Sequence, residues 1–404
     1  MKKNGFAPFG FLFIFFFMFL TFVMSASITY AADTDKTIWT WDVYVIPPDS
    51  GWESDYGVSV ERALKWHEAE VSDSGNGIQG HDLNFILLPP LTEDSAASFS
   101  LPPAPHPVAV FSFASDIVDK ILVNRVTSLP LLLAGGETVF FFERSKRVLP
   151  NVFALDLFRD FRSGVFADYA AKTMSKSPGA RIGVLGARFT LHEEREAGIC
   201  SDLLRKYGFM PLPFWSDASV TDAFGMVENE IKGYSNGVLI SAIGSMGTKE
   251  VWRGIMGHRS PYQIWYMGSP DRSFLSCRGM IFTDQNMYLE ERGGFENVKR
   301  EFWTTRTLAV TNKTGAGRAN ALAVWLIKSL EKIPDAIKRE DADRGVLLAL
   351  LAEAKDIPFG NQTLNIDRYT HRPEKRRVSI LEVRNKIFAV LDTMDANGLR
   401  YIDE

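Results

Sequence analysis

The chain has 404 residues, with 45 lysines and arginines against 49 aspartates and glutamates, which gives a net charge of −4. That length allows two domains, and this slightly acidic chain shows none of the basic character of a nucleic-acid-binding protein. Only Cys200 and Cys277 are present; they could pair in an oxidising compartment or remain two buried, small apolar residues.

The N-terminal segment has the layout of a secretory signal peptide. Lys2 and Lys3 precede an apolar run over residues 6–28, and Ala31 with Ala32 offers small residues for cleavage. We expect residues 1–31 to be removed, which takes away two lysines and no acids and leaves an exported protein. The alternative is an uncleaved membrane anchor, because the apolar run is long enough to span a bilayer.

The first predicted elements form a strand–helix–strand unit. Residues 37–46 alternate and are rich in β formers, so they predict a strand, and residues 57–71 predict an amphipathic helix. Glycines in the stretch 72–80 stop this helix and form a tight turn before a second strand at 81–88. Such a unit belongs to a parallel sheet, in which ligands meet the loop after the first strand.

The alternation of strands and helices continues along the chain. The many prolines between residues 89 and 107 leave room for one short helix at most. We predict strands at 108–113, 129–133 and 152–155 and a helix at 115–126. This order is typical of a doubly wound α/β domain.

A second α/β block is predicted after residue 160. Two late apolar helices and two short final strands are expected to follow it. The predicted helices are 161–174, 192–207, 221–232, 249–256, 318–331 and 345–354, and the predicted strands are 181–185, 209–215, 237–241, 262–267, 378–383 and 386–391.

Two glycine motifs lack the context that their usual chemistry requires. Gly233-Tyr-Ser235-Asn-Gly237 matches the serine hydrolase pattern, but a helix precedes it and a strand follows, the reverse of a nucleophile turn. Gly315-Ala-Gly317 opens a helix without a clear strand before it, which disfavours a dinucleotide site. We therefore expect no catalytic residues, no cofactor and no enzymatic activity.

Metal-binding patterns are also absent from the sequence. None of the six histidines forms an H-x-x-x-H pair. Residues 392–404 partly match a calcium loop, but Thr393 occupies its first ligand position, so we favour a frayed acidic C-terminus. The basic run over residues 372–377 is interpreted as a solvated face.

Two successive α/β blocks behind a signal peptide resemble the type I periplasmic solute-binding proteins. The resemblance is strongest to the branch that binds leucine, isoleucine and valine for ABC importers, and it spans about residues 37–393. It depends on Tyr56-Gly57, Ala63, Ala69, Gly75-Asn-Gly-Ile-Gln-Gly80, Leu129-Pro130 and the late helix from Gly315 to Ser329.

The resemblance implies two Rossmann-like, doubly wound lobes with a ligand cleft between them that closes by hinge motion. Residues 32–155 and 272–375 would form the N-terminal lobe, and residues 156–271 and 376–404 the C-terminal lobe. Hinge crossings are expected near residues 156, 269 and 376.

The resemblance also implies a set of ligand-binding residues in the loops. Ser115 and Thr138 are similar to the hydroxyl pair that holds a ligand carboxylate, and Gly136 permits close backbone approach. Tyr56 matches the aromatic residue that packs on the ligand side chain, and Asp271 lies beside the position of the acid that receives an ammonium. The alternatives are an N-cap serine, a loop threonine, a core tyrosine and a turn aspartate.

Three departures from the family pattern concern the ligand. Glu137 stands where a small or hydroxyl residue is usual, and its carboxylate would repel a ligand carboxylate. If Glu137 faces the cleft, an amide, a polyol or a cation is favoured as the ligand. The loop 242–246 lacks the family's aromatic residue, and residues 82–107 replace a full helix.

These observations predict the substrate-binding subunit of an ABC-type importer, which captures a small polar solute such as an amino acid. Its partners would be this small-molecule ligand and an ABC permease in the inner membrane, and we expect a monomer that does not bind nucleic acid. The alternative is a ligand sensor or scaffold on the same fold that regulates a partner protein. An enzyme is the weakest alternative, because no nucleophile–base set survives its structural context.

Overall fold

The computed structural model describes residues 39–137, 149–174, 181–188, 191–216, 224–225, 227–228, 237–259, 262–268, 272–285, 313–334, 342–359 and 362–397. Contacts divide the chain into residues 1–39 and residues 40–404, and only Trp39 of the first unit is described. The predicted signal peptide, Ser235 and most of the predicted helix 221–232 lie outside the described residues. No helix in these ranges is long and apolar enough to cross a membrane.

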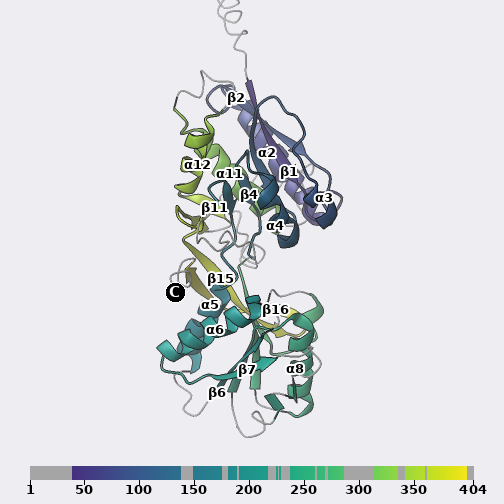
Figure 1. Ribbon diagram of the computed structural model, residues 1–404, viewed down its shortest axis with the longest axis vertical. Coiled ribbons are helices and arrows are strands. Elements are labelled where there is room, and N and C mark those ends of the chain that lie inside the picture. The colour runs from purple at the N-terminus through teal and green to yellow at the C-terminus, as the bar shows by residue number, and fades with distance from the viewer. Residues whose placement is uncertain are drawn as a thin grey trace, which may run out of the picture. The chain divides into compact units, whose positions relative to one another are not determined.

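A five-stranded sheet comes first in the chain (Figure 1). The pairs β1–β3, β3–β4 and β4–β5 are parallel, as the strand–helix alternation predicts. In the order β2-β1-β3-β4-β5, its strands are β1 Trp39–Ile46, β2 His81–Leu87, β3 Pro107–Ser112, β4 Leu131–Leu133 and β5 Val152–Ala154.

Both faces of this sheet are covered by apolar contacts. Alternate residues of β1 point to opposite faces, so Val43 packs in one hydrophobic cluster and Tyr44 in another. On the Val43 face lie α2 (Asp55–Asp73), α11 (Lys313–Leu330) and α12 (Arg344–Ala352); on the Tyr44 face lie the short α3 (Glu93–Ala97) and α4 (Asp116–Arg125). The single short helix expected in the proline-rich stretch is therefore confirmed.

The second sheet has seven strands, in the order β16-β15-β10-β9-β8-β6-β7. The pairs β6–β7, β6–β8, β8–β9 and β9–β10 are parallel, whereas β10–β15 and β15–β16 are antiparallel. Its strands are β6 Arg181–Ala187, β7 Leu212–Ser216, β8 Gly237–Ser241, β9 Tyr262–Tyr266, β10 Ile281–Asp284, β15 Lys375–Arg384 and β16 Ile387–Asn397.

Helices also cover both faces of the second sheet. Helices α5 (Phe161–Met174) and α6 (Leu191–Lys206) lie on one face (Figure 1). They bury Phe166 and Cys200 in a common core. On the other face α8 (Ser245–Gly257) buries Val251 in a core that also holds Cys277. The two cysteines thus belong to separate clusters, and both are free thiols. Two doubly wound α/β sheets confirm the predicted fold class.

The C-terminal third departs from the prediction in two ways. The strands expected at 378–383 and 386–391 are one longer hairpin, β15–β16, and Thr393 and Asp395 of the suspected calcium loop lie in its second strand. Two small antiparallel pairs were not predicted, because each strand has only two or three residues and shows no measurable alternation. They are β11 Ile357–Phe359 with β12 Gln362–Leu364, and β13 Ile366–Asp367 with β14 Arg372–Pro373.

The segment after residue 271 joins the second sheet. The 3₁₀ turn Arg272–Phe274 buries Phe274 against the seven-stranded sheet, and β10 pairs with β9 and β15 of that sheet. The strand was missed because the stretch before it has no periodic pattern. Residues 272–285 therefore continue the second sheet rather than return to the first.

The start of α2 depends on a close approach of the preceding loop. A Cβ atom on Gly57 would lie 2.2 Å from the carbonyl oxygen of Gly51. Because backbone atoms cannot yield as a flexible side chain can, the helical gain of an alanine is outweighed by overpacking. Gly198, inside α6, has no atom within 4 Å of the same position.

Gly57→Ala should therefore destabilise the protein by about 2 kcal/mol, whereas Gly198→Ala should stabilise it by up to about 1 kcal/mol. Urea denaturation of both variants beside the wild type measures this. Stabilisation by both substitutions would show that the contact between the loop and α2 is not tight.

Candidate functional site

Four loops follow the carboxyl ends of neighbouring strands in the five-stranded sheet. They come after β1, β3, β4 and β5, and they meet because these strands are adjacent and parallel. In open α/β sheets this edge is where ligands bind. The sequence-predicted residues Tyr56, Ser115 and Gly136 all lie in or beside these loops.

Ser115 is the N-cap residue of α4, but its side chain makes no capping hydrogen bond. Its backbone N–H instead donates to Oδ1 of Asp49, from the loop after β1, at 3.0 Å. A carboxylate at this place is favourable because it faces the positive end of the helix dipole. The protein's own aspartate thus binds the backbone of Ser115, a residue that the resemblance assigns to ligand binding.

Gly136 occupies a backbone conformation that favours glycine, with φ of +94°. Its N–H donates to Oδ1 of Asp116 at 3.0 Å, and its carbonyl accepts a hydrogen bond of 2.8 Å from Arg372. A Cβ atom here would lie 3.2 Å from both Ala154 and Leu133. The position therefore has to be glycine for two reasons, conformation and space.

Glu137 does not carry an uncompensated charge. Its carboxylate is 2.8–2.9 Å from Nη2 of Arg162 and also accepts a hydrogen bond from Gln285. Its carbonyl accepts from the N–H of Arg159 at 3.0 Å. Because a buried guanidinium faces this carboxylate, the repulsion of anionic ligands that the sequence suggested for Glu137 is largely offset.

Tyr56 is half-buried in the first turn of α2. Its ring meets Phe113 edge-on, at 6.5 Å between ring centroids, and a Cβ on Gly315 of α11 would lie 3.3 Å from it. Burial raises the pKa of the Tyr56 hydroxyl, and the nearby Arg318 opposes this rise. Tyr56 thus packs against α11 at the edge where the loops meet. Thr138 and Asp271, the other two predicted residues, lie outside the described residues.

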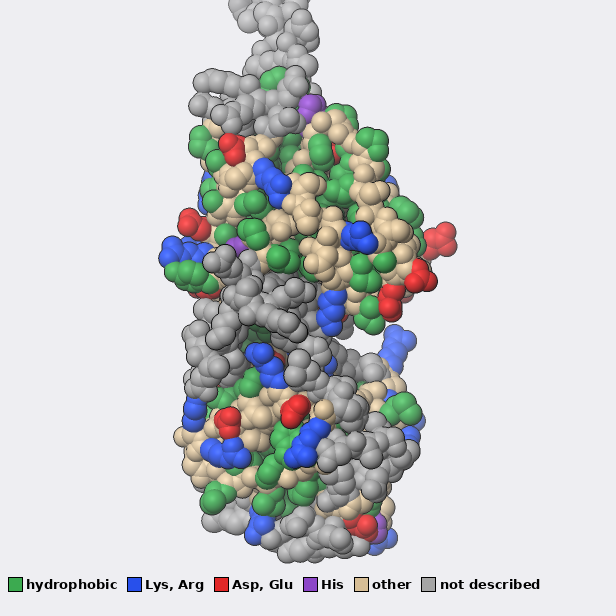
Figure 2. Space-filling model, in the orientation of Figure 1, with side chains coloured by type: hydrophobic (Ala, Val, Ile, Leu, Met, Phe, Trp, Pro, Cys, Tyr) green, Lys and Arg blue, Asp and Glu red, His purple; other side chains and the backbone are tan. Residues whose placement is uncertain are grey.

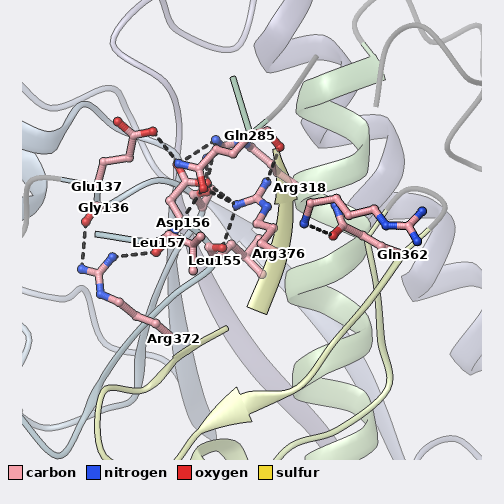
Figure 3. A network of polar contacts seen from close by, with 12 residues as sticks. Gly136, Glu137, Leu155, Asp156, Leu157, Gln285, Arg318, Gln362, Arg372 and Arg376 are labelled. Carbon is pink, nitrogen blue, oxygen red and sulfur yellow. Dashed lines mark hydrogen bonds and ion pairs between the residues drawn. The ribbon is translucent and has the colours of Figure 1, made fainter. Parts of the chain in front are cut away.

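A buried ionic cluster behind these loops is centred on Asp156 (Figure 3). Arg318 of α11 donates to both carboxylate oxygens, at 2.8 and 3.0 Å, and to the carbonyl of Ala134. Arg376 of β15 donates to Oδ1 of Asp156 at 2.7 Å and to the carbonyl of Leu155 at 2.9 Å. One carboxylate therefore binds an arginine from each of the two sheet systems.

Arg372 and Gln285 extend this cluster (Figure 3). Arg372 donates to the carbonyls of Asp156 (2.6 Å) and Gly136 (2.8 Å), and its guanidinium lies 3.9 Å from the ring centroid of Phe158. The Gln285 side chain accepts from Arg376 at 3.0 Å and from the N–H of Leu157 at 3.2 Å. Loop 134–137 is therefore held by donors from four different parts of the chain: Arg159 with Arg162, Gln285, Arg318 and Arg372.

The arginines of the cluster keep the Asp156 carboxylate ionised. Burial alone would raise the pKa of Asp156, but Arg318 and Arg376 outweigh it and hold that pKa below its ordinary value. Burial lowers the pKa of Arg372 to about 9, so its guanidinium remains charged at neutral pH. Asp156 is thus ionised whenever the protein is folded near neutrality.

A second buried group of charges lies next to Glu137, at the start of α5. Glu196 of α6 is 2.5 Å from Arg159, and Asp160 is 2.8 Å from Arg195. Burial raises the pKa of Glu196 to about 7 although Arg159 and Arg162 oppose this, and Asp160 and Glu137 add to the rise. Here desolvation outweighs the ion pair.

The sequence interpretation missed this cluster. The run 372–377 was taken for a solvated face, but Arg372 and Arg376 are 1% and 0% exposed. The signal that could have shown it is the alternation of β15, in which Arg376 points inward and Arg377 outward. A single sequence gives no partner for such an arginine, because Asp156 and Arg318 are distant in the chain.

Charged side chains of both signs are present on the face that Figure 2 shows. Lysines and arginines are interspersed with aspartates and glutamates over the described part of this face. Such a distribution gives little long-range attraction for a polyanion.

The fold and the carboxyl-edge loops define the class: this is a type I periplasmic binding fold with two α/β lobes. No protein-family model matches the sequence, and no curated protein matches it at the sequence level. Solved structures do share the fold. A substrate-binding protein of an ABC transporter from Desulfitobacterium hafniense, in complex with Leu, has a TM-score of 0.64 at 12% identity and covers 87% of this chain and 100% of its own.

Two further structures are similar over comparable lengths. A fatty acid ABC transporter substrate-binding protein from Thermomonospora curvata has a TM-score of 0.60 at 12% identity, covering 89% of this chain and 93% of its own. A solute-binding protein from R. palustris in complex with benzoate has a TM-score of 0.56 at 12% identity, covering 89% and 97%. All three are substrate- or solute-binding proteins of ABC transporters.

Proposed function

We propose that this protein is the substrate-binding subunit of an ABC-type importer and captures a small polar solute between two lobes. The observation that carries the proposal is the set of polar loops at the carboxyl edge of the first sheet, on a fold shared with transporter binding proteins. The protein would be exported to the periplasm, act as a monomer and deliver its ligand to a membrane permease, with no chemistry of its own.

The lobes would follow the sheets. One lobe would combine residues 39–155 with 313–373, and the other 156–285 with 375–397, because these ranges supply the two sheets and their cores. Asp156, Gln285 and Arg376 would then lie where the chain passes between the lobes. Hinge closure around a ligand is the motion that such crossings permit.

The ligand is expected to differ from those of the similar structures. Leucine, a fatty acid and benzoate all carry a carboxylate. In this chain the N–H groups of Ser115 and Gly136 already bind Asp49 and Asp116. A ligand carboxylate would have to displace an aspartate and would meet its charge, so we favour a neutral or cationic polar solute.

A thermal-shift screen tests the proposal. Amino acids, amides, polyols, amines and aromatic acids are added separately to the purified protein after removal of bound solutes. A ligand at one hundred times its Kd should stabilise the protein by about 2.7 kcal/mol, so the melting temperature rises with concentration. If leucine, isoleucine and valine have no effect while another class stabilises, the branched-chain assignment fails and the binding role stands. If no class stabilises the folded, solute-free protein, the importer proposal is wrong.

A pair of glycine variants tests whether the ligand meets loop 134–137. Gly136→Ala should reduce the ligand-induced shift at a fixed ligand concentration, because the strained residue displaces the loop. Gly279→Ala replaces another glycine with positive φ (+82°) that has no atom within 4 Å of the added Cβ. It should lower the melting temperature but leave the ligand-induced shift unchanged. An equal loss of shift in both variants would place the ligand elsewhere.

A further inference from the structure

The carboxylate of Glu137 joins elements that belong to different cores. Loop 134–137 follows β4, and Ala134 packs in the core of the five-stranded sheet. Arg162 lies in the first turn of α5, whose apolar residues pack on the seven-stranded sheet. Gln285 directly follows β10 of that sheet. Both groups that hold the Glu137 carboxylate therefore come from the second sheet system.

We propose that Glu137 is a positioning residue that couples the ligand loop 134–137 to the crossing segment 155–159, so that both move as one unit. This rests on the proposed function, since it assigns to loop 134–137 the contact with the solute. It adds to that function a role for the Glu137 side chain. Through it, a solute bound at loop 134–137 would change the position of one lobe relative to the other.

The contacts form a closed circuit that gives the coupling its route. Glu137 holds Gln285 through its side chain and Arg159 through its carbonyl. Gln285 in turn accepts from the N–H of Leu157 and from Arg376. A displacement of loop 134–137 therefore reaches Leu157, which has no hydrogen bond to Glu137, through a side chain of the second sheet.

Burial makes this circuit stiff. The Arg162 side chain is 2% exposed and that of Glu137 is 16% exposed. A charge-assisted hydrogen bond of this kind is stronger than a neutral one, so the loss of one partner has a larger effect than the loss of a neutral hydrogen bond. Glu196 also lies near Arg162, but its ion pair, at 2.5 Å, is with Arg159.

Hydrogen exchange tests the coupling without a known ligand. In Glu137→Gln, measured by mass spectrometry at single-residue resolution on the whole chain, the N–H of Arg159 should exchange about tenfold faster. The N–H of Leu157 should accelerate by a similar factor, which a purely local loss at Glu137 would not produce. Amides of β1 serve as internal reference and should change by less than about twofold.

The control and the second variants make the result decisive. Glu61→Gln removes a half-exposed carboxylate that pairs with Lys65 on α2, and it should change none of these amides. Arg162→Gln should accelerate the same amides, and the double variant should add little to either single one because the pair acts as a unit. If Glu137→Gln does not fold, Glu137→Asp is used instead. It keeps the negative charge, but its shorter side chain places the carboxylate farther from Arg162 and Gln285, so exchange should change less at the same amides. Acceleration at Arg159 with no change at Leu157 overturns the proposal.

A distance measurement separates this inference from the proposed function. Spin labels at Lys65→Cys on α2 and Asp202→Cys on α6 occupy exposed sites, and the native cysteines are buried. The distance distribution should broaden in Glu137→Gln relative to the labelled parent. If the distribution broadens but the protein binds no solute, the coupling through Glu137 is supported and the importer role is wrong. If the distribution is unchanged but the protein binds a solute, the importer role is supported and the coupling is wrong.

Discussion

The Asp156→Asn variant is expected to be less stable than the wild type by about 3–5 kcal/mol. Asp156 is 3% exposed, and its partners Arg318 and Arg376 are 7% and 0% exposed. Both guanidiniums around the carboxylate are therefore buried away from water. An amide keeps the size of the carboxyl group but cannot balance Arg318 and Arg376. Breaking a buried ion pair from one side is costly because the charge that remains is not compensated.

Urea denaturation at pH 7 measures the effect, with Asp395→Asn as the matched control. Asp395 is half-exposed on β16 and lies 2.6 Å from Lys375. Exposed pairs contribute little, so this variant should change the free energy of unfolding by less than about 0.5 kcal/mol. Equal effects of the two substitutions would mean that the Asp156 cluster is open to water.

Replacing Asp156, Arg318 and Arg376 together with apolar residues is not expected to restore the stability. Some buried ion pairs can be exchanged for apolar groups at no loss. Here the two arginines also donate to the carbonyls of Ala134, Leu155 and Gln285, which would lose these donors inside the protein. The arginines thus satisfy the backbone as well as the carboxylate.

The free energy of unfolding should fall by about 2–3 kcal/mol between about pH 4.5 and pH 7 because of Glu196. Its pKa is raised by burial from 4.5 to about 7 in the folded protein. Within this window the unfolded chain releases the proton while the folded protein keeps it. The unfolded state therefore binds fewer protons, stability decreases as pH rises, and the decrease ends above pH 7.

Comparison of the wild type with Glu196→Gln isolates this titration. The variant lacks the group, so its stability should not show this decrease, and the difference between the two curves should change through the window. Glu61→Gln, half-exposed on α2, should follow the wild type. Asp156 has a lowered pKa, so its stabilisation is lost only in more acid solution and does not interfere above pH 5. Parallel curves for the wild type and Glu196→Gln would show that Glu196 has an ordinary pKa when folded.

Much of the fold could be predicted from the sequence because its elements are long and periodic. The helix at 161–174 and the strand at 237–241 have the predicted bounds, since a buried stripe or a short apolar run marks each of them. The glycines at 75, 77 and 80 do take the positive φ values that the turn after α2 requires. Short pairs such as β13–β14 carry no such pattern and depend on tertiary contacts.

The candidate site could be predicted from the sequence only in part. Local patterns locate Ser115 at a helix start and Gly136 in a glycine loop, but they do not show what each one binds. Asp49, Asp116 and Arg372 complete these positions, and their separation along the chain reaches 236 residues for Gly136 and Arg372. The ion pairs of the buried cluster join residues that are distant in the chain, such as Asp156 and Arg376, so a single sequence could not reveal them.

The order in which the chain is made bears on how it can fold. The core under the first sheet includes Trp325 and Ile366, and the cores of the second sheet include Val378 and Leu381. Neither core is complete until these late residues have been made, so an emerging chain lacks a finished hydrophobic interior until then. Removal of the hairpin β15–β16 should therefore impair both sheet systems, because Arg376 leaves the Asp156 cluster with it.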